Sequence, residues 1–338
     1  MLKACGEPLL NSYDLAMFDL DGVVYVGGRA IPGVPDRLER VRASGVHLAF
    51  VTNNASRTPD RVAEKLTTMG IEATAADVVT SAQAAARVVK ERFGSSASVL
   101  LLGGRGLEAA LAAEGLTITT EPSEAAAVVS GYGPDVLWKD VMRAATLVRG
   151  GLPYVASNTD MTIPTDYGLA PGHGVLVGAI TRFAGVEPIV AGKPARPLLD
   201  ETIRRVGGER PLMVGDRLDT DIEGAHAVGV DSLLVMTGVT GLPELVAAPP
   251  RLRPSYVSPD LEGLFHTHDV PAQAEGRTRL GGWVATVEDG TLLVEGEGPT
   301  ADWWRVVATS SWDAFDTSGS VVDVTQVQPP DGDGRGGR

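Results

Sequence analysis

Hydrophobic and polar positions along the chain follow two alternating patterns. Short apolar runs rich in β-branched residues predict strands at residues 15–20, 47–52, 99–102, 127–130, 153–156, 211–214 and 232–236. Amphipathic stretches between several of them predict helices at residues 35–44, 59–69, 81–93, 138–148, 197–206 and 222–228. Because strands that alternate with helices form parallel sheets with right-handed crossovers, the pattern predicts an α/β fold.

The pattern changes near residue 270. The segment "GGWVATVEDGTLLVEG" predicts two strands joined at an Asp-Gly turn, "TADWWRVVATSSWDAF" has helical spacing, and "SGSVVDVTQV" predicts one more strand. We therefore expect a small α+β module with a ββαβ order at residues 270–328, followed by a disordered low-complexity tail at 329–338. Because so short a unit buries little apolar surface, we expect it to pack on the chain's own core or on a second subunit.

Composition narrows the classes of function. The chain has 338 residues, of which 43% are hydrophobic and 21% charged, as in a soluble globular protein of two or three domains. Its formal net charge of −14, without a basic stripe, argues against nucleic acid or an anionic membrane as a partner. The single cysteine excludes an internal disulfide, and the first residues lack the apolar core of a signal peptide, so we expect a cytoplasmic protein.

Two aspartates, Asp19 and Asp21, stand at the end of the first predicted strand and are followed by Gly22. In an open parallel sheet, reactive groups collect outside the carboxyl ends of the strands. This stretch alone also fits a structural Asp-Gly turn, whereas a calcium loop is disfavoured because residues 23–25 offer no carboxylate. Taken alone, the pair leaves a functional site and a structural turn equally open.

Three later strand ends also carry polar clusters. Each cluster taken singly can be explained as a helix cap, a surface turn or an acidic first turn of a helix. Four clusters at strand ends of one α/β chain favour a common site instead. The three later clusters are Thr52-Asn53-Asn54, Lys193 in "VAGKPA", and Asp216, Asp219 and Asp221 in "LMVGDRLDTDI".

Taken together and in this order, DLDG, VTNN, GKP and GDRLDTD resemble the four motifs of the haloacid dehalogenase superfamily over residues 13–265. The DGVVY continuation, the TNN triplet and "SNTDMTIPTDYGLAPGHG" are similar to the branch that hydrolyses phosphoglycolate, glycerol phosphate, pyridoxal phosphate and 4-nitrophenyl phosphate. The resemblance implies a Rossmann-like parallel-sheet core at residues 1–83 and 187–269, with an inserted α/β cap at 84–186. The module after residue 270 lies outside it.

The resemblance also implies the chemistry, a Mg²⁺-dependent hydrolysis of phosphomonoesters through an aspartyl-phosphate. Asp19 would be the nucleophile, and Asp21 would protonate the leaving group and later take a proton from water. Mg²⁺ would be held by the Asp19 carboxylate, the Asp21 carbonyl and Asp216, with Asp221 in the outer shell. The remaining contacts to the phosphoryl group would come from Thr52, Asn53, Asn54 and Lys193.

An insertion of about 100 residues is far longer than a loop and should fold as the cap that sets specificity. The resemblance places substrate contacts at Trp138, Ile163 and Pro164, with Asn158, Asp160 and His173 nearby. Structural alternatives remain open for several of them. Trp138 would then lie in the core, His173 in an exposed turn between two glycines, and Asn158 and Asp160 would fix the backbone of their loop.

The substrate class implied is a small phosphorylated metabolite such as glycerol phosphate or phosphoglycolate, and caps of this type allow a homodimer. A nucleotidase or a phosphotransferase on the same fold stays open, because the same phosphate would meet the same core. A regulatory or binding protein that acts through the module at 270–328 is the alternative from a different class.

Overall fold

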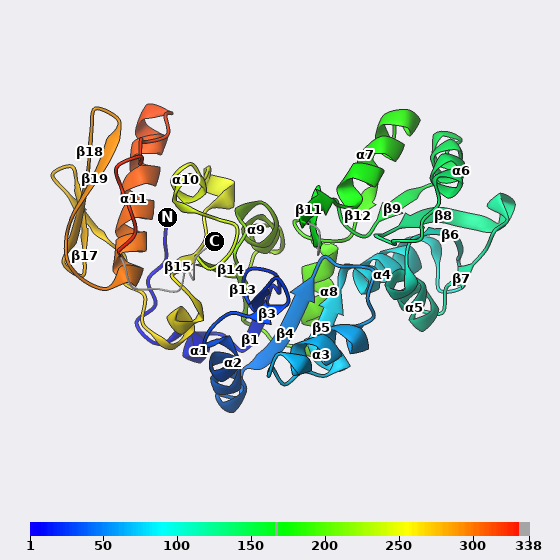
Figure 1. Cartoon of the computed structure of the whole chain (residues 1–338), viewed down its shortest axis with the longest axis horizontal. Coiled ribbons are helices and arrows are strands. Elements are labelled where there is room, and N and C mark those ends of the chain that lie inside the picture. Colours follow the sequence, from blue (N-terminus) through cyan, green and yellow to red (C-terminus); the bar gives the residue numbers. More distant parts are fainter. Residues whose placement is uncertain (166–167, 331–338) are drawn as a thin grey trace. The chain divides into compact units, whose positions relative to one another are not determined.

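The structure is a computed structural model that describes residues 1–165 and 168–330 (Figure 1). Its contacts divide the chain into two compact units, Met1–Leu48 with Gly208–Arg338, and Ala49–Gly207. Among the described residues, no helix combines the length and the apolar character that crossing a bilayer requires.

The first unit contains four parallel strands in the order β15-β14-β13-β1. All four residues of β1 are buried, as expected for a strand covered on both faces, which explains its unbroken apolar run. The strands are β1 (Leu15–Phe18), β13 (Pro211–Gly215), β14 (Asp231–Val235) and β15 (Tyr256–Ser258), with a small β2 (Tyr25–Val26) and β3 (Arg29–Ala30) hairpin. The helices that accompany them are α1 (Leu9–Ser12), α2 (Val34–Ala43), α9 (Glu223–Val228) and α10 (Leu242–Val246).

The second unit contains two sets of parallel strands. The strand β4 (His47–Thr52) continues into this unit and pairs with β5 (Val78–Thr80). A five-stranded parallel sheet has the order β12-β9-β8-β6-β7. Its strands are β6 (Ser98–Leu102), β7 (Thr117–Ile118), β8 (Ala125–Ser130), β9 (Tyr154–Ala156) and β12 (Ile189–Val190), and a separate hairpin joins β10 (Thr162–Thr165) to β11 (Gly168–Pro171). The helices are α3 (Pro59–Thr68), α4 (Ser81–Phe93), α5 (Arg105–Ala113), α6 (Trp138–Arg149), α7 (His173–Ala184) and α8 (Pro197–Val206).

The C-terminal module belongs to the first unit and consists of an antiparallel sheet with one long helix against it (Figure 1). Its elements are β16 (Ala272–Ala274), β17 (Arg277–Leu280), β18 (Trp283–Glu288), β19 (Thr291–Gly296) and α11 (Thr300–Ser318). The helix buries Trp303, Trp304 and Trp312 in one apolar cluster with α10. The Trp312 indole donates to the Leu245 carbonyl at 2.8 Å. The expectation that the module packs on the chain's own core is therefore confirmed.

The predicted α/β fold with parallel sheets is confirmed, but the ββαβ order of the module is wrong. Two further strands, β16 and β17, precede the predicted pair. The expected last strand is reduced to a single bridge between Asp323 and Thr291, at which Leu292 N donates to Asp323 O and Asp323 N donates to Gly290 O. The domain limits at 84, 186 and 269 stay a prediction, and the predicted tail from residue 331 on lies outside the described residues.

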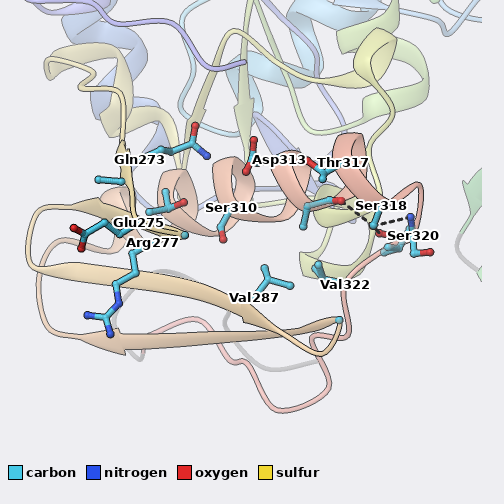
Figure 2. Close-up of a pocket in the computed structure, with 16 residues that line it drawn as sticks. Gln273, Glu275, Arg277, Val287, Ser310, Asp313, Thr317, Ser318, Ser320 and Val322 are labelled. Atoms are coloured by element: carbon cyan, nitrogen blue, oxygen red, sulfur yellow. Dashed lines mark hydrogen bonds between the residues drawn. The ribbon is translucent and has the colours of Figure 1, made fainter.

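A hollow of about 560 Å³ lies in the module (Figure 2). It is lined by the β16–β17 hairpin, by α11 and by the segment that follows this helix. Glu275, Arg277 and Asp313 place charges of both signs around it. None of the residues that line it belongs to the site predicted from the sequence.

Candidate active site

Three carboxylates converge in the first unit. Asp19, Asp216 and Asp221 each offer an oxygen, and these oxygens all lie within 4.8 Å of one another. Asp19 follows β1 and Asp216 follows β13, and these strands pair in parallel, so their carboxyl ends meet at one edge. A backbone hydrogen bond of 2.9 Å from Asp19 to the Val214 carbonyl extends the pairing to the site itself.

Asp216 is fully buried and is held by close backbone contacts. The Val239 amide donates to its Oδ2 at 2.6 Å. A Cβ on Gly22 would lie 2.3 Å from this oxygen, and one on Gly238 would lie 1.9 Å from it. Gly22 also has a φ of 89°, which side chains rarely adopt. Both positions therefore need glycine so that the loops after β1 and β14 can close around the carboxylate.

Asp221 orients the loop that carries Asp216. Its Oδ2 accepts from the amides of Asp216 and Arg217, each at 3.1 Å. Asp221 is expected in the outer shell of the metal, and these bonds agree with that because Oδ2 is already occupied by two backbone amides. Asp219 is instead 62% exposed and pairs with Arg217 at 2.8 Å.

Asp21 lies in a different environment from Asp19. Asp21 is exposed and Asp19 is half-buried, although only Leu20 separates them. The Tyr25 hydroxyl donates to Asp21 Oδ2 at 3.4 Å, and a tight turn returns the Gly22 amide to the Tyr25 carbonyl at 2.9 Å. Two carboxylates in such different surroundings are suited to separate chemical roles.

The acidic group formed by Asp19, Asp216 and Asp221 fits a hard divalent cation. Carboxylate oxygens are the ligands that Mg²⁺ prefers, and like charges this close repel one another unless a cation lies between them. The residues present therefore fit the magnesium site predicted from the sequence.

A second group of predicted residues meets in the second unit. Thr52 ends β4, is buried, and its Oγ1 accepts from the Asn54 amide at 3.1 Å. The Asn54 side chain caps its own loop, since its Oδ1 accepts from the amide and the hydroxyl of Ser56 at 2.9 Å each. Asn54 Oδ1 is therefore engaged within its own loop, and a contact of Asn54 with phosphate stays a prediction.

The Asn53 side chain joins two distant segments. Its Oδ1 accepts from the Lys193 amide at 2.8 Å, and its Nδ2 donates to the Lys193 carbonyl and to Asp160 Oδ1, both at 3.0 Å. Lys193 is only 2% exposed. Asn158 donates to the Asn53 carbonyl at 2.6 Å and accepts from the Asp160 amide at 3.1 Å. These bonds favour the structural alternative for Asn158, in which it fixes the backbone.

His173 is not in an exposed turn but is the buried first residue of α7. Its Nε2 lies 3.0 Å from the Ser130 hydroxyl, which in turn lies 2.8 Å from the Tyr154 hydroxyl. Burial lowers the pKa of His173 to about 4, so the imidazole is neutral near pH 7. Its role as a substrate contact stays a prediction.

The glycines on both sides of His173 favoured the alternative of an exposed turn, but they have a different cause. A Cβ on Gly172 would lie 2.3 Å from the Asp160 carbonyl, and one on Gly174 would lie 2.2 Å from the Thr159 carbonyl. They are glycines because the backbone of another segment passes against the start of α7, which no local pattern reveals.

The other predicted substrate residues lie on α6 and on the β10–β11 hairpin. Trp138 begins α6 and is 69% exposed, so its placement in the core is wrong. Ile163 is half-buried in β10. The side chain of Pro164 lies outside the described part of the structure. Contacts of Trp138 and Ile163 with substrate stay a prediction.

The loop after β14 also takes part in the acidic site, and the sequence interpretation missed it. Thr237 donates to the Gly22 carbonyl at 2.6 Å, and Gly238 and Val239 surround Asp216. The available signal was the polar pair Thr237-Gly238 directly after the strand predicted at residues 232–236, in the same way that polar residues follow the strands at the other four clusters.

Comparison with known proteins agrees with the motifs. A family model described as haloacid dehalogenase-like hydrolase matches residues 16–117, and one described as HAD-hydrolase-like matches residues 190–264. D-glycerol 3-phosphate phosphatase of Mycobacterium tuberculosis is 39% identical over 318 residues, covering 91% of this chain and 88% of the relative. Acid sugar phosphatase of Staphylococcus saprophyticus is 34% identical over 254 residues, covering 75% of this chain and 96% of the relative.

Solved structures give the same picture. Glycerol phosphate phosphatase from Mycobacterium tuberculosis in complex with magnesium has a TM-score of 0.83 at 39% identity, covering 91% of this chain and 92% of that one. 4-Nitrophenylphosphatase from Thermotoga maritima has a TM-score of 0.69 at 31% identity, covering 76% of this chain and 97% of that one. By this extent of identity and by its four ordered motifs, the chain belongs to the haloacid dehalogenase-like hydrolases, in the branch of that family that contains the phosphatases.

Proposed function

We propose that this protein is a Mg²⁺-dependent phosphatase that hydrolyses small phosphomonoesters through an aspartyl-phosphate. The observation that carries the proposal is the convergence of Asp19, Asp216 and Asp221 within 4.8 Å beside the exposed Asp21. Phosphoryl transfer to an aspartate needs a metal site, a carboxylate that attacks and a carboxylate that moves protons. The acidic group, the half-buried Asp19 and the exposed Asp21 can supply these three parts.

In the proposed reaction, an oxygen of Asp19 attacks phosphorus, and the bond from phosphorus to the ester oxygen breaks. Asp21 gives its proton to the departing alkoxide. Water then attacks the phosphorus of the aspartyl-phosphate and gives a proton to Asp21, which releases inorganic phosphate and restores Asp19. Mg²⁺, held by Asp19, the Asp21 carbonyl and Asp216, would neutralise the charge on the phosphoryl oxygens.

The resemblance to the family assigns the phosphoryl group also to Thr52, to the backbone of Asn53, to Asn54 and to Lys193. Thr52 is suited to this because its Oγ1 accepts from Asn54, which leaves the hydroxyl proton for an anionic oxygen. Lys193 supplies positive charge from a buried position, where water screens it little.

Glycerol phosphate is the first substrate to test. The relative named D-glycerol 3-phosphate phosphatase supports it, since it matches 91% of this chain. Acid sugar phosphatase matches a shorter part and supports a sugar phosphate as the second choice.

The test is release of inorganic phosphate from a panel of glycerol 3-phosphate, phosphoglycolate, sugar phosphates and nucleoside monophosphates, with Mg²⁺ and with excess chelator. We expect Mg²⁺-dependent release and inhibition by Ca²⁺, whose longer bonds and higher coordination number disturb in-line geometry. Activity that survives chelation contradicts the metal site. Appearance of a phosphorylated acceptor in place of free phosphate favours the phosphotransferase, and preference for the nucleotides favours the nucleotidase.

A further inference from the structure

One side chain in the second unit holds both main-chain polar groups of Lys193. Asn53 Oδ1 accepts from the Lys193 amide at 2.8 Å, while Asn53 Nδ2 donates to the Lys193 carbonyl at 3.0 Å. The two residues are 140 positions apart. Because the contact is made at two points, it fixes both the orientation of the peptide groups of Lys193 and their distance from Asn53.

The backbone of Asn53 is itself anchored. Its carbonyl accepts from the Ser81 hydroxyl at 2.5 Å and from Asn158 Nδ2 at 2.6 Å. Gly192 also lies close to the amide group, since a Cβ at this position would be only 2.6 Å from Asn53 Oδ1. Asn53 is 9% exposed, so water does not readily replace these partners.

Asp160 selects the orientation of the Asn53 amide. An ionised carboxylate only accepts hydrogen bonds, so the NH₂ group must face Asp160 Oδ1, which lies 3.0 Å away. A flipped amide would set its oxygen against this carboxylate and its NH₂ against the Lys193 amide. Asp160 is fixed in turn, because its amide donates to Asn158 Oδ1 at 3.1 Å and its carbonyl accepts from the Gly174 amide at 2.8 Å.

We propose that Asn53 is a positioning residue that fixes Lys193 relative to Thr52, its own neighbour in sequence, and that Asp160 locks the Asn53 amide in the required orientation. This inference rests on the proposed function, in which Thr52 and Lys193 bind the phosphoryl group. It assigns the side chain of Asn53 to Lys193, leaving only its backbone for phosphate. It also gives Asp160 a role in place of direct substrate contact.

The first arm of the test measures kcat and KM for phosphate release in Asn53→Asp, Asp160→Asn and the double variant. Asn53→Asp keeps the acceptor for the Lys193 amide but sets a carboxylate against Asp160, and we expect kcat to fall on the order of 100-fold, as for a misplaced catalytic group. Asp160→Asn should lower kcat less, because its amide oxygen can still accept from Asn53.

In the double variant, the side-chain amide introduced at position 160 can donate to the carboxylate introduced at position 53. We expect kcat to recover at least about tenfold over Asn53→Asp, a coupling that independent sites do not show. Asn11→Asp, the same change at an exposed position in α1, is the matched control and should behave as the wild type.

The second arm does not depend on activity. An amine-reactive reagent followed by peptide mass spectrometry measures how fast Lys193 is modified relative to the exposed Lys139. We expect Lys193 to be protected in the wild type, modified at least about tenfold faster in Asn53→Asp because its segment opens locally, and protected again in the double variant.

Wild-type kcat and wild-type protection of Lys193 in Asn53→Asp would overturn the inference, as would a double variant no better than Asn53→Asp in both arms. A wild-type protein without Mg²⁺-dependent phosphate release would overturn the proposed function instead. The labelling arm would then decide by itself whether Asn53 holds Lys193. If Asn53→Asp does not fold, recovery of folding, of kcat and of Lys193 protection in the double variant shows the same coupling, and a double variant that also fails to fold overturns the inference.

Discussion

The acidic group of the first unit and the amide group of the second unit are held in place by different means. Main chain approaches Asp216 Oδ2 closely at Gly22 and at Gly238, and the Val239 amide donates to this oxygen at 2.6 Å. Asn53 is held by side chains and main chain that lie 107 and 140 positions away along the chain. The acidic group therefore depends on two glycines, since a Cβ at either position would collide with Asp216. The amide group depends on hydrogen bonds from Asn53 to distant residues.

The most severe way to break the acidic group is to remove its proposed nucleophile. Asp19→Asn keeps the size of the side chain but removes the attacking charge, so we expect phosphate release to fall by at least about 10³-fold. Asp219→Asn is the matched control, because this carboxylate belongs to the same acidic segment as Asp216 but is 62% exposed. Substantial steady-state turnover by Asp19→Asn would exclude the covalent route.

A methyl group should disrupt the same site without replacing any of the metal-ligand residues. Gly238→Ala would place a Cβ 1.9 Å from Asp216 Oδ2, so the carboxylate has to move. We expect the Mg²⁺ concentration for half-maximal activity to rise roughly 10- to 100-fold, as when the surroundings of metal ligands are changed. A Mg²⁺ titration of phosphate release measures this.

Gly178→Ala provides the control for that change. Gly178 lies within α7 with nothing within 4 Å of the added Cβ. This variant should leave the Mg²⁺ titration as it is and raise the stability of the protein by about 0.5–1 kcal/mol, since alanine favours a helix over glycine. Equal Mg²⁺ titrations for both glycine variants would show that the close approach to Asp216 does not matter.

The contrast between the two groups also explains what could be predicted from the sequence. Asp19 and Asp216 each end an apolar run, so the strand pattern made both of them candidates, and the family resemblance implied that they share a metal site. The parallel pairing of β1 with β13 brings these two strand ends together. No pattern marks Asp160 as the partner of Asn53, because hydrogen bonds between loops follow from the packed fold. Sequence patterns therefore supplied only candidates for that region, and the structure assigned partners among them.

The expectations and alternatives that the structure contradicts all depended on local sequence alone. A histidine between two glycines is typical of a turn. At His173, however, both positions are glycine because the backbone of residues 159 and 160 passes too close for a Cβ. The final strand of the module has β-branched residues but pairs only at Asp323, because a strand depends on its neighbour as much as on its own composition. For Trp138, only the alternative of a place in the core is wrong, because its side chain is 69% exposed.

Each unit also buries a histidine, and the one in the first unit should make stability depend on pH. His268 Nε2 lies 2.8 Å from the Gly263 carbonyl and its Nδ1 lies 3.1 Å from the Arg305 guanidinium, so the ring is a neutral donor and acceptor. Burial, aided by the Arg305 charge, lowers the pKa of His268 from 6.5 to about 4. The unfolded chain therefore binds this proton first as the pH falls.

Acid should therefore destabilise the fold through this residue. The contribution of the neutral His268 to the free energy of unfolding is fully present above pH 6.5 and is lost as the pH falls toward 4. At pH 4 this loss amounts to roughly 3 kcal/mol. Urea unfolding at pH 7 and pH 4.5 measures the loss, and His268→Gln, which can donate and accept without titrating there, should reduce it. His266→Gln is the control, because His266 is 65% exposed. An unchanged pH dependence in His268→Gln would mean that other groups, such as His173 in the second unit, account for it.

The smallest expected effect on stability comes from Trp138, and it separates specificity from folding. Trp138 is 69% exposed at the start of α6, whereas Trp312 is fully buried in α11. Trp312→Ala should cost about 3–5 kcal/mol of unfolding free energy, because it leaves a cavity where the module packs on α10. Trp138→Ala should change stability by less than about 0.5 kcal/mol, as surface substitutions do.

If Trp138 contacts the leaving group, kcat/KM should nevertheless shift between phosphate esters by roughly 10-fold, while inhibition by inorganic phosphate, which has no leaving group, stays constant. Steady-state kinetics on glycerol 3-phosphate and a larger sugar phosphate measure this shift. An unchanged ranking of the two esters would move the specificity contact to another residue, with Ile163 in β10 as the next to test.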